Sequence, residues 1–138
     1  MNLSGKTVLI VDDEPFMLAL LTHVLGNLGA TLLMAVNGKD ALALAEKNTI
    51  HAVIVDYYME GWDGVETISR IKLLSQYRQL PAILLTSRGQ ALIRQKSEAS
   101  GITAFFTKPF SPSELTATVG KLLSAPAQNS YEVTGGGG

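Results

Sequence analysis

The sequence has no cysteine, which excludes disulfides, thiolate metal sites and a cysteine nucleophile. It has no large excess of either charge, because 11 Lys and Arg face 12 Asp and Glu, so nothing draws it globally to nucleic acid or to an acidic membrane surface. It also has no apolar run as long as a membrane-spanning helix needs, and no signal-peptide pattern. We therefore expect a cytoplasmic protein that binds neither nucleic acid nor membrane. Its 138 residues suit one domain.

What the sequence does contain is five short apolar runs, each followed by a segment of helical character. The runs occupy residues 7–11, 31–36, 51–55, 81–86 and 103–106. They are apolar throughout rather than alternating, which is typical of strands buried on both faces. Five strand–helix units in this order favour an α/β fold, a parallel sheet with helices on both faces.

Periodicity and capping residues mark the five helices. In the first, Phe16, Leu20, Val24 and Leu28 recur every four residues, and we expect this stripe to lie in the core, with Gly29 ending the helix. Segments 38–48 and 89–100 are the second and fourth. The remaining two begin at typical capping patterns, Asp63 with Glu66 and Ser111 with Pro112 and Glu114.

The helical pattern ends near residue 124. The segment after it, APAQNSYEVTGGGG, is small, polar and rich in glycine. We expect one domain over residues 1–124, and over residues 125–138 a flexible tail or a truncated linker.

Chemically reactive side chains stand at the ends of the predicted strands. The first strand ends in Asp12 and Asp13, the third in Asp56, the fourth in Thr86 and the fifth in Lys108. The functional crevice of an open parallel α/β sheet lies outside the carboxyl ends of its strands. If these strands are neighbours, three carboxylates, a hydroxyl and a lysine converge there.

Three converging carboxylates repel one another unless a cation joins them. A hard divalent cation such as Mg²⁺ prefers a few carboxylates together with water and phosphate oxygens. The lysine adds a second positive charge, and the threonine adds a hydroxyl donor. The set suits phosphoryl transfer, in which Asp56 is the nucleophile and becomes an aspartyl phosphate.

Four segments, VLIVDDE, VIVDYYMEGWDG, ILLTS and FFTKPF, resemble in order and spacing the receiver domain of two-component response regulators. The resemblance spans roughly residues 5–124. It implies a doubly wound, five-stranded sheet of flavodoxin-like order 2-1-3-4-5. It also implies a signalling switch that a histidine kinase or a histidine phosphotransfer protein phosphorylates, and that catalyses its own phosphotransfer and dephosphorylation without being an enzyme in the usual sense.

The resemblance also assigns roles. Asp56 is the phosphoacceptor. Asp13 binds Mg²⁺ directly and Asp12 through water, while the backbone carbonyl of Tyr58 completes the metal ligands. Lys108 contacts the phosphoryl group.

The switch and the reading surface are likewise implied. Thr86 moves toward the phosphate and Phe106 turns inward with it, while the Lys108–Pro109 bond is cis. Phosphorylation then changes the surface of helix 4, strand 5 and helix 5. A downstream effector or a missing output domain reads this surface, and a phosphorylation-dependent dimer is one outcome.

One loop departs from the family pattern, because Glu60 stands where proline is usual and Trp62 lies before Asp63. Loss of proline loosens a turn, and Glu60 adds negative charge. An alternative function is therefore a phosphorylation-independent scaffold. Trp62 either contacts a partner or packs on the third helix. Nucleotide-binding glycine motifs are absent from the sequence, which argues against a nucleotide enzyme on this fold.

Overall fold

Five parallel strands form one sheet in the predicted order β2-β1-β3-β4-β5. The computed structural model describes residues 2–87 and 101–124. Four of the strands differ from the predicted ranges by one residue at one or both ends. The strands are β1 (Thr7–Val11), β2 (Thr31–Ala35), β3 (Ala52–Asp56), β4 (Ala82–Thr86) and β5 (Ala104–Thr107).

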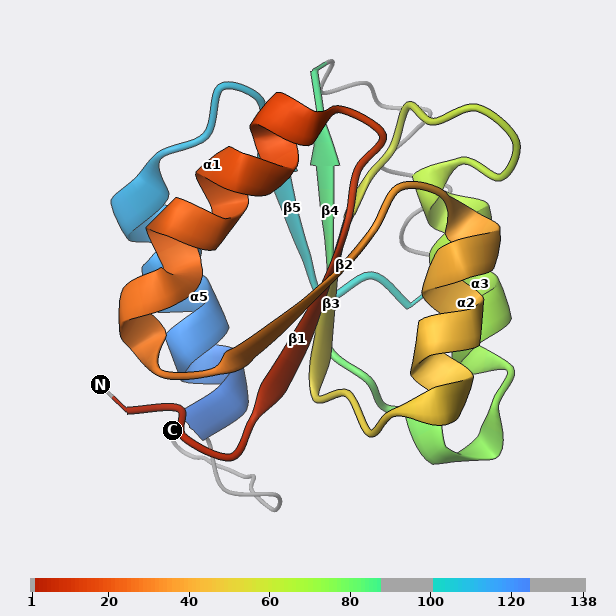
Figure 1. Cartoon of the computed structure of the whole chain (residues 1–138), viewed down its shortest axis with the longest axis horizontal. Coiled ribbons are helices and arrows are strands. Elements are labelled where there is room, and N and C mark those ends of the chain that lie inside the picture. Colours follow the sequence, from red (N-terminus) through yellow and green to blue (C-terminus); the bar gives the residue numbers. More distant parts are fainter. Residues whose placement is uncertain (1, 88–100, 125–138) are drawn as a thin grey trace.

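Helices cover both faces of the sheet, with α1 and α5 on one side and α2 and α3 on the other (Figure 1). The predicted helix over 89–100 and the segment 125–138 lie outside the described residues. The described helices are α1 (Pro15–Leu25), α2 (Gly38–Lys47), α3 (Gly64–Lys72) and α5 (Pro112–Ser124), with short 3₁₀ turns at Gly26–Leu28 and Ser75–Tyr77. None of them is long and apolar enough to cross a membrane.

The predicted helix starts are confirmed by their caps. Asn37, Asp63 and Ser111 each accept a hydrogen bond from the backbone N–H three residues on, at 2.8, 2.8 and 3.3 Å. These bonds satisfy backbone N–H groups that have no partner inside the helix. The first residues of α2, α3 and α5 are therefore determined by the residue that precedes each helix.

The core consists of two apolar layers, one on each face of the sheet. Residues of β1, β3 and β4 alternate between them, which explains why these strands are apolar throughout. The first layer lies under α2 and α3 and includes Leu9, Val53, Leu84, Ile68 and Ile71. The second lies under α1 and α5 and includes Ile10, Ile54, Leu85, Leu21 and Leu115.

The predicted stripe of α1 is only partly correct. Val24 and Leu28 pack against the core as partly buried residues, but Leu18, Leu21 and Leu25 are the buried residues of this helix and Phe16 is 77% exposed. A four-residue spacing drifts around a helix of 3.6 residues per turn. The stripe therefore leaves the core at its first residue.

Candidate functional site

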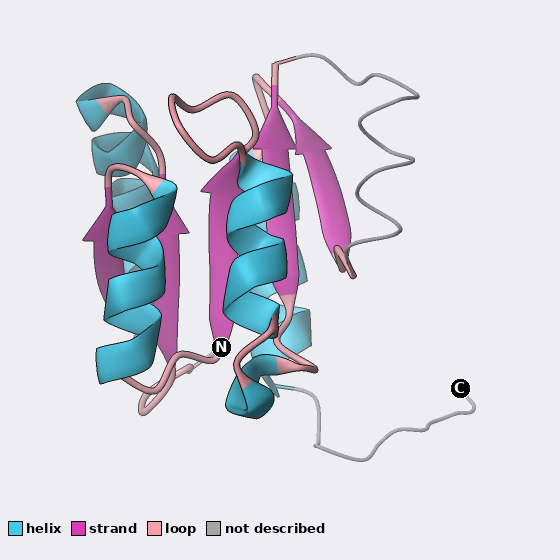
Figure 2. Cartoon of the chain, turned by 90° about the vertical axis from the view of Figure 1, so that its right-hand side faces the viewer, coloured by secondary structure: helices cyan, strands magenta, loops and turns pink. Residues whose placement is uncertain are grey.

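The carboxyl ends of the strands lie at one end of the sheet, where the arrowheads in Figure 2 meet the loops that follow them. Asp56 is the last residue of β3 and pairs with Leu85 of β4. Asp12 directly follows β1, and its N–H donates to the carbonyl of Ala35 at 3.1 Å. The N–H of Lys108 donates to the carbonyl of Thr86 at 2.7 Å. Sheet pairing thus places all three side chains at the same end.

The three predicted acids converge. Carboxylate oxygens of Asp12, Asp13 and Asp56 lie within 4.8 Å of one another. Asp12 is fully buried and Asp56 is 4% exposed, whereas Asp13 is exposed. Two carboxylates are therefore taken out of water while the third faces solvent, an arrangement that is costly without positive charge nearby.

Lys108 supplies that positive charge. Its Nζ lies 3.0 Å from Asp56 Oδ1 and 3.2 Å from Asp12 Oδ2, with Glu14 Oε1 further away at 4.0 Å. The Lys108–Pro109 peptide bond is cis, as the resemblance implied. Lys108 thus joins the ends of β1, β3 and β5.

Burial dominates the electrostatics of the acids. It raises the pKa of Asp56 from 3.8 to about 6, although the hydrogen bond from Lys108 opposes the change, and the negative charge of Asp12 raises it further. Burial also raises the pKa of Asp12, against a hydrogen bond from the N–H of Glu14. Burial alone would lower the pKa of Lys108, but the hydrogen bond and charges of Asp56 and Asp12 raise it.

A hollow of about 530 Å³ opens above these groups, lined by Asp13, Glu14, Asp56, Tyr58, Ser87 and Lys108. Its size admits a phosphoryl group together with a hydrated ion. Mg²⁺ holds its oxygens at about 2.0–2.1 Å, so ligands on opposite sides of the ion are about 4 Å apart. Carboxylate oxygens within 4.8 Å of one another fit such an ion after a small closure.

Gly64 is a site residue that the sequence analysis missed. A Cβ atom there would lie 2.5 Å from the carbonyl oxygen of Asp56 and 2.7 Å from Leu84 Cδ1. Its N–H donates to the carbonyl of Tyr57 at 2.9 Å. The start of α3 therefore rests directly on the backbone of Asp56, and only glycine permits this approach.

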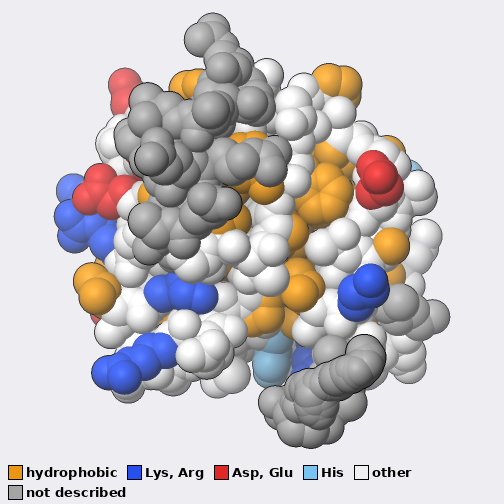
Figure 3. All heavy atoms as spheres, turned by 180° about the vertical axis from the view of Figure 1, so that it is seen from behind, with side chains coloured by type: hydrophobic (Ala, Val, Ile, Leu, Met, Phe, Trp, Pro, Cys, Tyr) orange, Lys and Arg blue, Asp and Glu red, His pale blue; other side chains and the backbone are white. Residues whose placement is uncertain are grey.

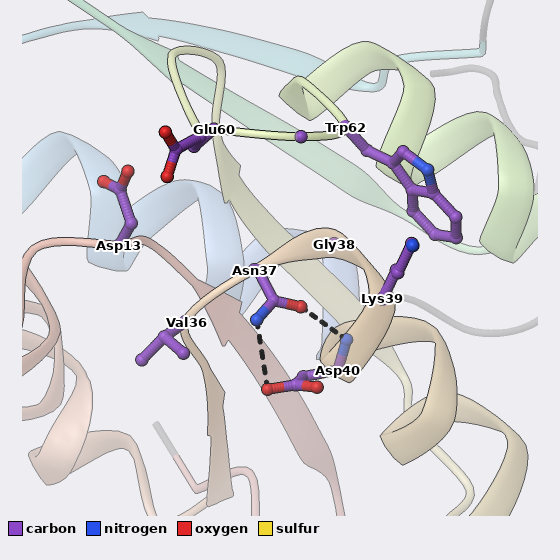
Figure 4. Close-up of a pocket in the computed structure, with 9 residues that line it drawn as sticks. Asp13, Val36, Asn37, Gly38, Lys39, Asp40, Glu60 and Trp62 are labelled. Carbon is purple, nitrogen blue, oxygen red and sulfur yellow. Dashed lines mark hydrogen bonds between the residues drawn. The ribbon is translucent and has the colours of Figure 1, made fainter.

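The loop that carries Glu60 forms a second hollow, of about 490 Å³, which shares Asp13 with the first. In Figure 4, Glu60 and Asp13 point toward each other across it. Gly61 has φ of +84°, a left-handed conformation that favours glycine. Negative charge thus extends beyond the three strand-end acids.

Trp62 is half-buried and packs on α3, as one of the two roles considered for it predicts. The guanidinium carbon of Arg70 lies 4.2 Å from the centroid of its ring. On α2, a Cβ added at Gly38 would lie 2.9 Å from Trp62. The indole therefore fills the space between α2 and α3 beside the site.

The family model of the response regulator receiver domain matches residues 8–120. The chain belongs to this family. It is 34% identical over 127 residues to the cyclic di-GMP phosphodiesterase response regulator RpfG of Xanthomonas campestris, and 34% identical over 116 residues to the transcriptional regulatory protein TcrA of Mycobacterium tuberculosis. It is 37% identical to a 14.6 kDa protein of Leptolyngbya boryana.

The aligned region spans a different share of each relative. It covers 91% of this chain and 34% of RpfG in one comparison, and 84% of this chain and 45% of TcrA in the other. In the Leptolyngbya comparison the values are 86% and 90%. The chain thus spans less than half the length of RpfG or TcrA and nearly the whole of the third relative.

Solved structures agree with the assignment. The chemotaxis protein CheY4 of Vibrio cholerae superposes with a TM-score of 0.81 at 31% identity, covering 85% of this chain and 98% of CheY4. The signal receiver domain of an HD domain-containing protein from Pseudomonas fluorescens gives a TM-score of 0.79 at 28% identity, covering 86% of each chain. The chain therefore has the CheY-like receiver fold.

Within this receiver domain, strand alternation separates the two residues assigned to the switch. Ala82 and Leu84 pack in the layer under α2 and α3, so Thr86, two residues further on, points to the same side. Phe106 packs in the opposite layer, whereas its neighbour Phe105 packs on the side of Thr86. Joint movement of Thr86 and Phe106 into one space does not fit this placement. Phe105 is the aromatic residue of β5 that packs on the face of Thr86.

Proposed function

We propose that this receiver domain is a phosphorylation-activated signalling switch in which Asp56 accepts a phosphoryl group from a phosphohistidine. The donor is a sensor histidine kinase or a histidine phosphotransfer protein. The observation that carries the proposal is the position of the Asp56 carboxylate. It is 4% exposed, borders an open hollow and lies 3.0 Å from Lys108 Nζ.

The transfer exchanges one bond for another. An oxygen of ionised Asp56 attacks phosphorus, the P–N bond to the donor imidazole breaks, and its electron pair stays on that nitrogen, which takes up a proton as the neutral ring is restored. Lys108 stabilises the negative charge that spreads over the phosphoryl oxygens, because its ammonium group already borders the nucleophile. Since burial raises the pKa of Asp56 to about 6, the carboxylate is ionised and competent at neutral pH.

Mg²⁺ fits the site as a resident ion. Asp13 and Asp56 would hold it with the backbone carbonyl of Tyr58, and Asp12 would hold it through water. Once bound, it supplies positive charge that offsets the repulsion between the carboxylates and the incoming phosphate. Asp13 suits direct binding because its carboxylate is the exposed member of the cluster.

We infer that Thr86 and Phe105 transmit the change. Thr86 is fully buried at the end of β4, and Phe105 is half-buried on the neighbouring strand and on the same face. The surface of β5 and α5, with helix 4 outside the described residues, is the part that a partner reads. Figure 3 looks onto this side, where hydrophobic side chains run down the middle of the face. By analogy with RpfG and TcrA, the reader is an output domain or a separate effector protein.

Intact mass measured after incubation with Mg²⁺ and acetyl phosphate tests the proposal. One added phosphoryl group is expected, absent from Asp56→Asn and from a sample with EDTA. Glu46→Gln, which changes an exposed carboxylate on α2, is the matched control and should be phosphorylated like the wild type. If no adduct formed and beryllofluoride did not bind, the phosphorylation-independent scaffold would be favoured. Glu60, which replaces the usual proline, would then be the first residue to test as the cause.

A further inference from the structure

Strand β2 forms an open edge of the sheet. Within residues 2–87 and 101–124 it pairs with β1 alone, and Figure 1 looks directly onto it, with α1 on one side and α2 on the other. None of the described elements lies across it. The opposite edge, β5, is followed at once by Lys108 and Pro109, residues that discourage strand pairing.

The backbone of β2 directs hydrogen-bonding groups outward. The N–H of Thr31 donates to Lys6, and the carbonyl of Ala35 accepts from Asp12, so Thr31, Leu33 and Ala35 face β1. Because these directions alternate along a strand, the N–H and C=O groups of Leu32 and Met34 point away from the sheet. This row can accept a further strand.

The strand itself carries no charge or proline that would protect this edge against pairing. Residues 31–36 read TLLMAV, without charge or proline. Met34 is 50% exposed and Val36 is 49% exposed. Natural edge strands normally carry lysine, proline or a bulge at such positions, because an exposed apolar edge binds other strands.

A hollow of about 340 Å³ runs beside the strand, lined by Met34, Ala35, Val36, Asp40, Ala43 and Leu44. Its walls are mostly apolar. An added strand would place its own side chains on this face as well as hydrogen-bonding to the backbone. Outward-pointing main-chain hydrogen-bonding groups and an apolar hollow thus lie together along the edge formed by β2.

We propose that β2 is a dimerisation edge at which a second copy of this chain adds its own β2, antiparallel across a two-fold axis that brings Met34 of one copy opposite Met34 of the other. The two five-stranded sheets would become one continuous sheet. A second copy is the occupant that this edge favours. Its neutral strand does not repel itself, and its sequence offers no charge to select a foreign strand. The two-fold arrangement also satisfies both open edges at once and closes the assembly.

This dimer would not depend on phosphorylation of Asp56. The edge groups belong to β2, which contributes no residue to the acid cluster. Its failure would leave the proposed function intact, and the reverse also holds.

Sedimentation velocity of the full chain over a concentration series is the first test. We expect a monomer–dimer equilibrium, and we expect Met34→Lys to raise the dissociation constant about tenfold or more by placing like charges opposite each other. Leu73→Lys, at an apolar position that is 81% exposed on the C-cap of α3, is the matched control and should dimerise like the wild type. Wild type that is still monomeric at ~1 mM would overturn the proposal, as would equal weakening by both substitutions.

Crosslinking identifies the edge itself. Because the chain has no cysteine, Met34→Cys can form a disulfide only between copies, and Leu73→Cys controls for chance collision. A disulfide dimer of Met34→Cys alone supports the edge, whereas a dimer that leaves this variant uncrosslinked uses another surface. Met34→Lys should retain wild-type circular dichroism and phosphoryl uptake from acetyl phosphate, which separates lost pairing from misfolding.

Discussion

Replacing Asp56 by Asn should stabilise the metal-free protein at neutral pH, although it removes the proposed phosphoacceptor. The pKa of Asp56 rises from 3.8 to about 6 on folding, chiefly through burial. At about 1.4 kcal/mol for each pH unit, the ionised carboxylate is disfavoured in the folded state by on the order of 3 kcal/mol relative to its neutral form. Asparagine is neutral and of similar shape, so it avoids most of this penalty. Lys108 keeps a partner, because Asp12 remains 3.2 Å away.

The pH dependence has a definite sign. A carboxyl group with a raised folded pKa carries its full penalty above about pH 6 and none below about pH 4, since the folded state then binds the proton as well. The stability gap between Asp56→Asn and the wild type should therefore be largest at pH 7.5 and should close toward pH 4. Mg²⁺ should narrow the gap at neutral pH. At about 100 times its dissociation constant a ligand adds about 2.7 kcal/mol, and the variant lacks one carboxylate ligand.

Urea unfolding followed by circular dichroism at pH 4, 5, 6 and 7.5, with EDTA and then with Mg²⁺, measures these differences. Glu46→Gln, at an exposed carboxylate, should track the wild type at every pH. If Asp56→Asn proved less stable than the wild type at pH 7.5 in EDTA, the ion pair with Lys108 would outweigh burial and the reasoning would be refuted.

Three further substitutions test the fold by urea unfolding, two of them beside the site. Gly64→Ala should destabilise the fold by about 1–3 kcal/mol and slow phosphorylation by acetyl phosphate, because its Cβ would meet the Asp56 carbonyl; unchanged stability would show that α3 yields easily. Glu60→Pro should stabilise by about 0.4–1 kcal/mol, since Gly61 already has the positive φ of a type II turn, and a loss would mean that the φ of residue 60 is incompatible with proline. Tyr77→Phe should destabilise by about 1–3 kcal/mol, because the Tyr77 hydroxyl bonds Ala45, Asn48 and Ile50; a neutral result would mean that water replaces it.

Much of the site could be predicted because parallel strands end at one side of a sheet. An apolar run that stops at Asp12, Asp56 or Lys108 already states where the side chain lies once the strand order is known. The alternation of strands and helices predicted a parallel sheet, and the family resemblance implied its strand order. These inferences needed only local pattern and topology.

The errors arose where the prediction depended on which face of a helix or strand a side chain occupies. A stripe beginning at Phe16 matched a four-residue spacing, but the true period of the helix rotates that residue into solvent. Phe106 was selected from its place in the motif, whereas the pairing of Thr86 with Thr107 puts Phe105, two residues earlier, on the face of Thr86. Little in the sequence indicated the role of Gly64, because that role is a close contact with the backbone of Asp56 and Tyr57, which only the folded structure shows.

The position of Trp62 gives the protein a single optical probe at a useful place. The indole is the only one in the chain. It lies between Gly38 and Arg70 and lines the second hollow, which Asp13 of the acid cluster also lines. Its emission therefore reports on one location without interference from a second tryptophan. An ion or phosphoryl group that changes the field at Asp13 would alter the surroundings of a chromophore nearby. Time-resolved fluorescence could thus follow the unlabelled protein in real time.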